Sequence, residues 1–257
     1  MSSKNILCVV EGEATEPKIL KKLNTEFIAR NSDFISIGTN IYHMYHKYTK
    51  QREEVGDEID MFIFLKKFDK NDVLKDKSKR DFRAIYLFMD LDRHEPLSIR
   101  YLDCVPEMLN LFNNETENGK LYISYPMVEA FKHPISDINH QISKIELGSK
   151  YKTHVSAICD KKLENYQHLS KDTISKYFLE HIKNTNYLIN DNCSYPIIYE
   201  SQFQEKFTQD IIYRNQLEKF ISSKNEVLVL SPFALFLLEY LGKPLFDEWK
   251  AICESES

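Results

Sequence analysis

Residues 84–92 read AIYLFMDLD, six apolar residues followed at once by two aspartates, Asp90 and Asp92. A continuous apolar run of this kind is typical of a central parallel strand that helices cover on both faces. In parallel α/β sheets, ligands bind beyond the carboxyl ends of the strands, where the loops leave the core. The stretch therefore predicts a buried strand at residues 84–89, with acidic side chains at the functional edge of its sheet.

The N-terminus repeats this arrangement of an apolar run followed by an acid. Residues 6–10 are apolar and stop at Glu11, and from Thr15 onwards apolar residues recur at helical spacing. Thr15 is the expected N-cap, and Pro17 suits the first helical turn because its missing N–H would have no partner there. We therefore expect a strand, a tight turn and a helix.

The remaining pattern predicts further strands and helices, and then a change of character. We expect a strand at 34–42, a polar helix at 50–67, an exposed charged connection at 66–83, a helix at 98–112 and a strand at 120–124. Beyond His133 the pattern is mainly helical, most clearly at 173–182, at 202–221 and in the apolar stretch 227–241, where Ser231 and Pro232 are the expected helix start.

These elements predict two regions. We expect an α/β domain with a Rossmann-like parallel sheet flanked by helices at residues 1–133. We expect residues 134–257 to form a mainly helical region for substrate, dimer or partner contacts, with a second copy of the chain as one candidate partner.

Composition and missing motifs exclude several classes of protein. The five cysteines are scattered and form no CxxC, so neither a disulfide framework nor a zinc site is indicated. No apolar stretch approaches the roughly 20 residues that span a bilayer, and residues 1–5 lack a signal peptide's apolar region, so we expect a cytoplasmic protein without membrane contact. A net charge of −5 means that nucleic acid would bind through local basic patches.

The acids at the strand ends are the candidate metal ligands. Asp90 and Asp92 are two apart in an extended segment, so their side chains point to one face, roughly 7 Å apart. Mg²⁺ prefers oxygen ligands and takes only one or two protein carboxylates per ion. A lone DxD means little among 39 acidic residues, but a strand ending in Glu-Gly followed by a later strand ending in DxD is a much rarer combination.

This combination resembles a known family signature. VEG at residues 10–12 followed by DLD at 90–92 is similar to the Toprim motifs of primases, topoisomerases, OLD-family nucleases and RloB-like proteins, over roughly residues 4–133. EGEATEP at 11–17 is closest to the RloB-like and OLD-like branches of bacterial anti-phage defence proteins, in which a second glutamate follows the EG pair; here it is Glu16. SYPMVE at 124–129 resembles their Ser-x-Pro-x-x-Glu segment.

The resemblance implies roles for these acids. Glu11 would be the general acid/base or the first metal ligand, while Asp90 and Asp92 would hold Mg²⁺, with Mn²⁺ as a substitute. Glu16 and Glu129 would bind a second ion or support the first. Glu16 could instead complement the helix dipole, and Glu129 could instead lie on the solvent face of a short helix.

Basic residues near these acids are candidates for substrate binding. They are Arg93 and His94, directly after the acids, Lys132 and His133, close to Glu129, and Lys18 and Lys21, on the first predicted helix. Cations at such positions can neutralise charge on a reacting phosphate or grip the phosphate backbone. An exposed turn and a solvated helix face are the plain alternatives.

The function implied by the resemblance is Mg²⁺-dependent cleavage of phosphodiester bonds in DNA or RNA, including tRNA, during anti-phage defence by abortive infection. The chain has no GxxxxGK[ST] motif, so an ATPase that controls the nuclease would have to be a separate chain. A primase-like nucleotidyl transferase and a non-catalytic Toprim binding or regulatory subunit remain alternative readings.

Overall fold

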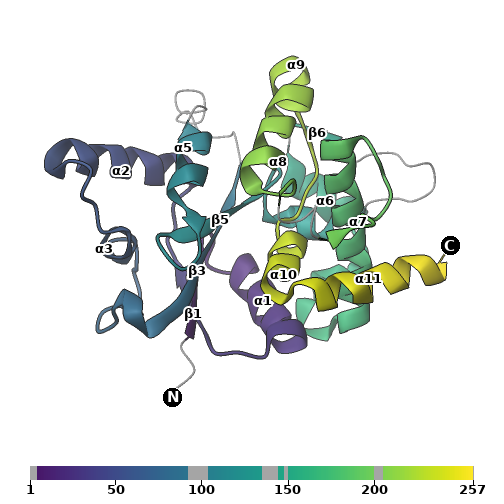
Figure 1. Cartoon of the computed structure of the whole chain (residues 1–257), viewed down its shortest axis with the longest axis horizontal. Coiled ribbons are helices and arrows are strands. Elements are labelled where there is room, and N and C mark those ends of the chain that lie inside the picture. Colours follow the sequence, from purple (N-terminus) through teal and green to yellow (C-terminus); the bar gives the residue numbers. More distant parts are fainter. Residues whose placement is uncertain (1–4, 92–103, 135–143, 148–149, 200–204, 257) are drawn as a thin grey trace. The chain divides into compact units, whose positions relative to one another are not determined.

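A five-stranded sheet with the order β2-β1-β3-β5-β4 is the centre of the first part of the chain (Figure 1). The computed structural model describes residues 5–91, 104–134, 144–147, 150–199 and 205–256. The strands are β1 (Asn5–Val10), β2 (Ser32–Ser36), β3 (Phe82–Asp90), β4 (Asn113–Asn114) and β5 (Gly119–Ser124). β1 pairs in parallel with both β2 and β3, whereas the short β4 pairs antiparallel with β5. The predicted α/β class with a mostly parallel sheet is therefore confirmed.

The central position of β3 explains its composition. Residues 84–89 are all buried, and the strand is exposed only at Arg83. Helices supply the cover that this run requires: α1 (Thr15–Leu23) lies on one side of the strands in Figure 1, and α2 (Ile41–Val55), α3 (Met61–Lys66) and α5 (Cys104–Leu111) lie on the other. The predicted central strand is confirmed.

Three expectations about local structure in this part are wrong. Helix α1 has Ala14 as its N-cap and includes Thr15 as its first residue. The predicted strand at 34–42 ends at Ser36, because the side chain of Asn40 caps a new helix by accepting the backbone N–H of His43 at 2.9 Å. The predicted helix at 50–67 is broken at residue 56, a glycine with φ +79°, and the chain enters α3 only after Asp60 caps it.

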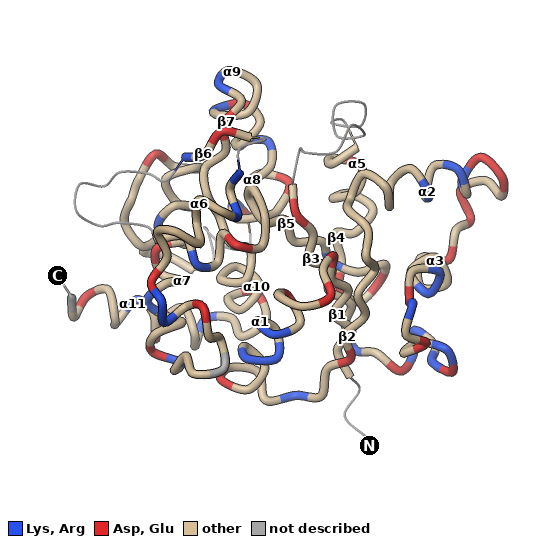
Figure 2. The backbone as a smooth tube through the Cα atoms, turned by 180° about the vertical axis from the view of Figure 1, so that it is seen from behind, with Lys and Arg blue, Asp and Glu red and all other residues tan. Residues whose placement is uncertain are grey.

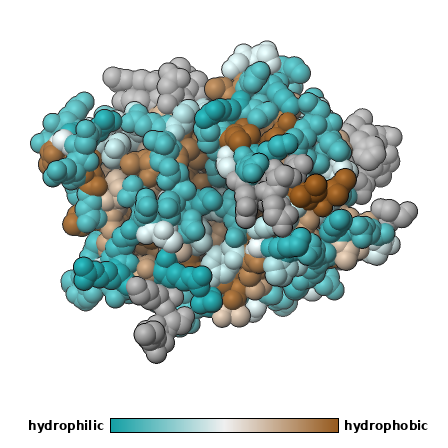
Figure 3. Space-filling view, viewed as in Figure 1, coloured by the Kyte–Doolittle hydropathy of each residue, from teal (hydrophilic) through white to brown (hydrophobic). Residues whose placement is uncertain are grey.

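The connection from α3 to β3 is exposed and rich in charge, as the sequence predicts. Lysine and aspartate alternate along it (Figure 2), and a 3-10 turn (Lys79–Asp81) leads into the strand. Phe68 and Leu74 are its buried residues. More widely, hydrophilic residues cover most of the face shown in Figure 3, with hydrophobic residues in small groups.

The second part of the chain is mainly helical. Its elements are η3 (Val128–Lys132), β6 (Lys144–Glu146), α6 (Tyr151–Ile158), η5 (Lys161–Glu164), η6 (Tyr166–His168), α7 (Lys171–Asn190), α8 (Gln209–Gln216), η8 (Leu217–Ile221), α9 (Ser222–Lys224), β7 (Glu226–Leu228), α10 (Phe233–Leu241) and α11 (Lys243–Glu256). The helices predicted at 173–182 and within 227–241 are confirmed by α7 and α10. The helix predicted at 202–221 begins only at Gln209 among the described residues.

Two details of this part differ from the prediction. β6 and β7 form a small antiparallel sheet that the sequence did not predict. Their three-residue strands are too short to leave a periodic pattern in the sequence. The N-cap of α10 is Pro232 rather than Ser231, whose backbone N–H donates to His181 Nδ1 at 3.2 Å instead. No helix in the described ranges is long and apolar enough to cross a membrane.

The chain divides into two compact units, Met1–Tyr122 and Ile123–Ser257. The division falls within β5, so the boundary that the sequence suggests at residue 133 lies inside the second unit. The core of the second unit is aromatic: Phe178 meets Phe131 and Trp249 edge-on, with ring centroids 5.5 and 6.1 Å apart. Each unit thus has a core of its own.

Candidate functional site

Glu11 and Asp90 meet at the carboxyl ends of β1 and β3. The two strands are neighbours in parallel register, with Val10 opposite Phe88, so the residues that follow them reach the same edge of the sheet. The backbone N–H of Glu11 donates to the Phe88 carbonyl at 3.2 Å, and the backbone N–H of Asp90 donates to Glu11 Oε2 at 3.1 Å. Both side chains are partly exposed. The Glu11 carboxylate thus reaches the backbone of Asp90, and the role of the two acids as metal ligands stays a prediction.

The end of β2 also holds Glu11 in place. The backbone N–H of Gly38 donates to the Glu11 carbonyl at 3.1 Å, and the Ser36 hydroxyl donates to the same oxygen at 3.4 Å. Gly38 has φ +54°, a left-handed conformation that suits glycine. Three neighbouring strand ends therefore fix the backbone of one glutamate, which leaves its carboxylate as the part of the residue that can respond to a ligand.

Glu16 closes the turn between β1 and α1. Its carboxylate accepts the backbone N–H of Gly12 at 3.0 Å, and the residue is only 5% exposed. A Cβ atom at position 12 would lie 2.7 Å from Glu16 Oε2, closer than real contacts allow, so this carboxylate occupies the space that a side chain would need. In this structure Glu16 is a first-turn acid that shapes the turn, and its role as a metal ligand stays a prediction.

Tyr42 is a residue that sequence reasoning missed. It is fully buried on α2, and its hydroxyl donates to the carbonyl of Leu91 at 2.8 Å. Leu91 lies between the two aspartates of the DLD motif. The predicted site residues Asp92, Arg93 and His94 lie outside the described residues. The contact joins positions 49 apart, and the sequence placed Tyr42 in a strand, so no local pattern indicated it. The Asn40 cap was the signal that could have placed Tyr42 on a helix.

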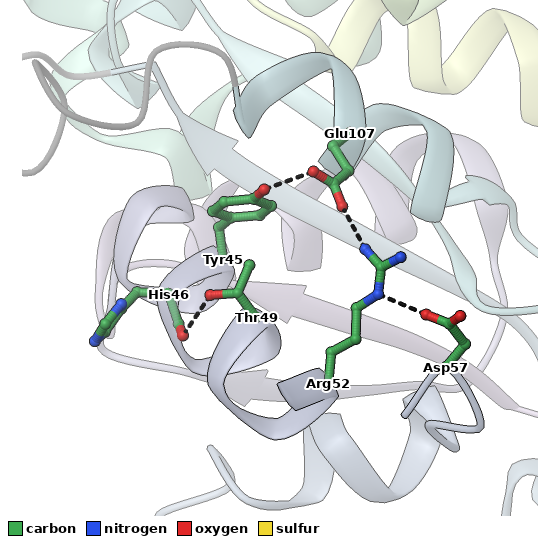
Figure 4. Close-up of polar contacts among 6 residues, drawn as sticks. All are labelled: Tyr45, His46, Thr49, Arg52, Asp57 and Glu107. Carbon is green, nitrogen blue, oxygen red and sulfur yellow. Dashed lines mark hydrogen bonds and ion pairs between the residues drawn. The ribbon is translucent and has the colours of Figure 1, made fainter. Parts of the chain in front are cut away.

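A second contact from α2 reaches α5, the helix that follows the DLD segment (Figure 4). The Tyr45 hydroxyl donates to Glu107 Oε2 at 2.5 Å, and Arg52 Nη1 donates to Glu107 Oε1 at 3.2 Å. The hydrogen bond to Glu107, followed by burial, raises the pKa of Tyr45 to about 12. Helix α2 therefore holds the chain on both sides of the segment that carries Asp92, at Leu91 and at Glu107.

Glu129, Lys132 and His133 belong to the second unit. Glu129 is 4% exposed and its Oε1 lies 3.3 Å from Lys152 Nζ, so the alternative that it faces solvent on a short helix is wrong. His133 is buried and stacks on Tyr151, whose hydroxyl lies 3.2 Å from His133 Nδ1. Its role in substrate binding stays a prediction, as does that of the partly exposed Lys132.

The other predicted substrate contacts lie on α1. Lys18 and Lys21 are both exposed, and Lys21 Nζ lies 5.8 Å from the centre of the Phe34 ring. Among the described residues, no group of three or more His, Cys, Asp and Glu side chains is placed to hold a metal ion. The described part of the candidate site thus consists of the Glu11 and Asp90 carboxylates, with Glu16 beside them in the turn.

Acidification is expected to destabilise the second unit through its buried histidines. Burial, with a smaller contribution from His154, lowers the pKa of His133 to about 4, and burial lowers that of His181 to about 3. Both values lie below that of an unfolded histidine, so the unfolded chain takes up protons first, and stability that is complete above about pH 6.5 is lost as pH falls towards 4. For His133 alone we expect a loss of roughly 2–3 kcal/mol.

Urea unfolding at several pH values, followed by tryptophan fluorescence, measures this loss, because the chain's one tryptophan, Trp249, lies in the second unit. The variant His133→Gln should show a shallower decline between pH 6.5 and 4 than the unaltered protein. An identical decline in the two proteins would show that His133 is not a source of the acid sensitivity.

Comparison of the chain with protein-family models, curated proteins and solved structures found no match. The functional argument therefore rests on the chain's own residues and on the arrangement described above.

Proposed function

We propose that the chain is a Toprim-type, metal-dependent nuclease that cleaves phosphodiester bonds of DNA or RNA. One observation carries the proposal: the backbone N–H of Asp90, at the end of β3, donates to the Glu11 carboxylate at the end of β1, at 3.1 Å. It brings the acid of the Glu-Gly motif and the first acid of the DxD motif to the edge of a parallel sheet where ligands bind.

The donor set suits magnesium. Glu11 and Asp90 offer only carboxylate oxygens, the ligands that Mg²⁺ and Mn²⁺ prefer, and two carboxylates meet the usual protein share of a magnesium site. Asp92 is the third proposed ligand, and Glu16 and Glu129 are proposed for a second ion or in support of the first. When bound, the metal would supply Lewis-acid stabilisation of the negative charge on the phosphate.

The residues themselves would do the remaining work. Glu11 would take a proton from the attacking water. The hydrogen bond from the backbone N–H of Asp90 to Glu11 Oε2 would keep the Glu11 carboxylate in one orientation. We propose that Arg93, His94, Lys18 and Lys21 bind phosphates of the substrate, and Lys132 and His133 are proposed as further phosphate contacts. Such contacts orient the strand rather than read its sequence.

We further propose that the nuclease acts in anti-phage defence under the control of an ATPase on another chain. The missing P-loop supports a separate ATPase, and the mainly helical second unit is the proposed surface for that partner, for the substrate or for a second copy of the chain. A cytoplasmic location fits these partners.

The decisive experiment is a cleavage assay on several substrate classes. Purified protein is incubated with end-labelled single-stranded DNA, duplex DNA and tRNA, in Mg²⁺, in Mn²⁺ and in EDTA. We expect cleavage of at least one class with either metal and none in EDTA, and no cleavage by Asp90→Asn. Equal cleavage in EDTA, or full activity of Asp90→Asn, would contradict the proposal.

Tyr42→Phe is expected to weaken the metal dependence of cleavage while keeping the fold. The change removes the hydroxyl that donates to Leu91 but keeps the buried ring, and the loss of such a bond costs about 1 kcal/mol of stability. With the Leu91 carbonyl released, the chain next to Asp90 is held less firmly, so we expect the Mg²⁺ concentration for half-maximal cleavage to rise severalfold. Tyr48→Phe, on the same helix, is the matched control. An unchanged magnesium requirement would show that Tyr42 serves packing alone.

A further inference from the structure

Helix α2 has a second face, which lines a hollow of about 250 Å³ together with the end of α3. While Tyr42 and Tyr45 point from α2 towards β3 and α5, Lys47 and Lys50 lie on the side of the hollow. Lys67, just after α3, completes its basic lining. Figure 2 shows positions of Lys and Arg in blue on α2 and next to α3.

The charge around the hollow is unbalanced. Three lysines line it against one carboxylate, that of Glu54. None of the three ammonium groups forms an ion pair within the described ranges, although ion pairs hold other cations of this unit, such as Lys77 with Asp33 at 2.6 Å. Gathered like charges repel one another, and they attract an anion that neutralises them.

Two of the lysines are held in place. Lys47 Nζ lies over the Phe68 ring, 4.7 Å from its centre, and Lys67 Nζ donates to Gln51 Oε1 at 2.6 Å. These contacts involve neutral groups, so they orient the ammonium groups without cancelling their charge. Part of the conformational entropy that a long side chain loses on binding is therefore already lost before any ligand binds.

The residues at the floor of the hollow limit the chemical class of ligand that can bind there. Phe64 and Phe68 line it, but both are at least 96% buried, so their ring faces are not open for a base to stack on. Three lysines around a hollow whose aromatic floor is closed to a base suit a backbone phosphate, which carries one negative charge. A lysine is a point charge that binds phosphate without demanding one geometry.

We propose that this hollow, lined by Lys47, Lys50 and Lys67, binds a backbone phosphodiester of the nucleic-acid strand. The proposal rests on the proposed nuclease function and adds a substrate contact on α2 and α3 to those suggested on α1. It also gives an acidic protein the local basic patch that nucleic-acid binding requires.

The test separates binding from cleavage. Binding of a fluorescein-labelled single-stranded oligonucleotide is measured by fluorescence anisotropy in EDTA across a range of salt concentrations. The triple variant Lys47→Gln/Lys50→Gln/Lys67→Gln is compared with Lys75→Gln/Lys79→Gln/Arg80→Gln, which has the same net charge and alters exposed residues of the same unit. Circular dichroism confirms that both variants are folded.

We expect the first triple variant to bind about tenfold more weakly near 100 mM salt and to reduce the slope of log affinity against log salt by about 0.7, the contribution of one lost phosphate contact on a single strand. The control triple should keep most of the slope. Equal slopes in the two triples, with wild-type cleavage intact, would overturn the phosphate site and leave the nuclease proposal standing. If the unaltered protein binds no oligonucleotide and cleaves none with Mg²⁺, both proposals fail.

Discussion

Replacing Glu11 by glutamine is expected to slow cleavage by about 10²- to 10⁴-fold, the range typical for loss of a general acid/base. Glutamine keeps the length of the side chain, and its amide oxygen can still accept the Asp90 N–H that Glu11 Oε2 accepts at 3.1 Å. The backbone bonds of Glu11 to Phe88 and Gly38 do not involve the side chain at all. The loss should therefore fall on the chemical step, while folding and substrate binding change little.

Single-turnover cleavage rates, measured beside binding in EDTA, separate these effects. Glu13→Gln is the matched control, because Glu13 lies two residues away, carries the same charge and is exposed. Any toxicity that the unaltered protein shows on expression should disappear in Glu11→Gln and persist in Glu13→Gln. Wild-type rates in Glu11→Gln would mean that the chemistry lies elsewhere in the molecule.

Trp249→Ala is expected to lower the free energy of unfolding of the second unit by about 3–5 kcal/mol. The side chain is fully buried, meets Phe178 edge-on, and donates from Nε1 to the Ser175 hydroxyl at 3.0 Å. Alanine would leave a large cavity and remove the partner of a buried hydroxyl, and both effects destabilise. Urea unfolding followed by circular dichroism measures the change, since the variant has no tryptophan.

The neighbouring Glu248→Gln provides the control. Glu248 pairs with Lys171 at 2.7 Å, but both side chains are more than a third exposed, and such surface pairs contribute at most about 1 kcal/mol. A loss of less than 1 kcal/mol in Trp249→Ala would show that α11 contributes little to the core of the second unit.

The parts of the fold that could be predicted are those with a strong local pattern. The run of buried residues in β3 and the one in β1 are continuous in the sequence, so both strands and the acids at their ends could be located in advance. Parallel pairing then brings Glu11 to Asp90, because the carboxyl ends of neighbouring parallel strands share an edge. This part of the candidate site follows from hydrophobic pattern and topology alone.

The parts that could not be predicted depend on contacts between distant residues or on single capping side chains. The Tyr42 hydroxyl donates to Leu91, 49 positions away in the sequence. The residues before Tyr42 in the sequence are partly apolar, which is a pattern typical of a strand. Helix α2 starts where the side chain of Asn40 caps it, and it ends where Gly56 adopts a positive φ. The hollow between α2 and α3 arises from this break, so the convergence of Lys47 with Lys67 had no counterpart in the linear pattern.

The close fit of the Glu16 carboxylate over Gly12 has a consequence for how the sequence can change over time. Any side chain at position 12 would displace the Glu16 carboxylate, and a displaced or shorter residue 16 would leave the N–H of Gly12 without its present acceptor. A substitution at either position alone is thus penalised by the other. The two sites form an epistatic pair, whose permitted substitutions a mutational scan of single changes would underestimate.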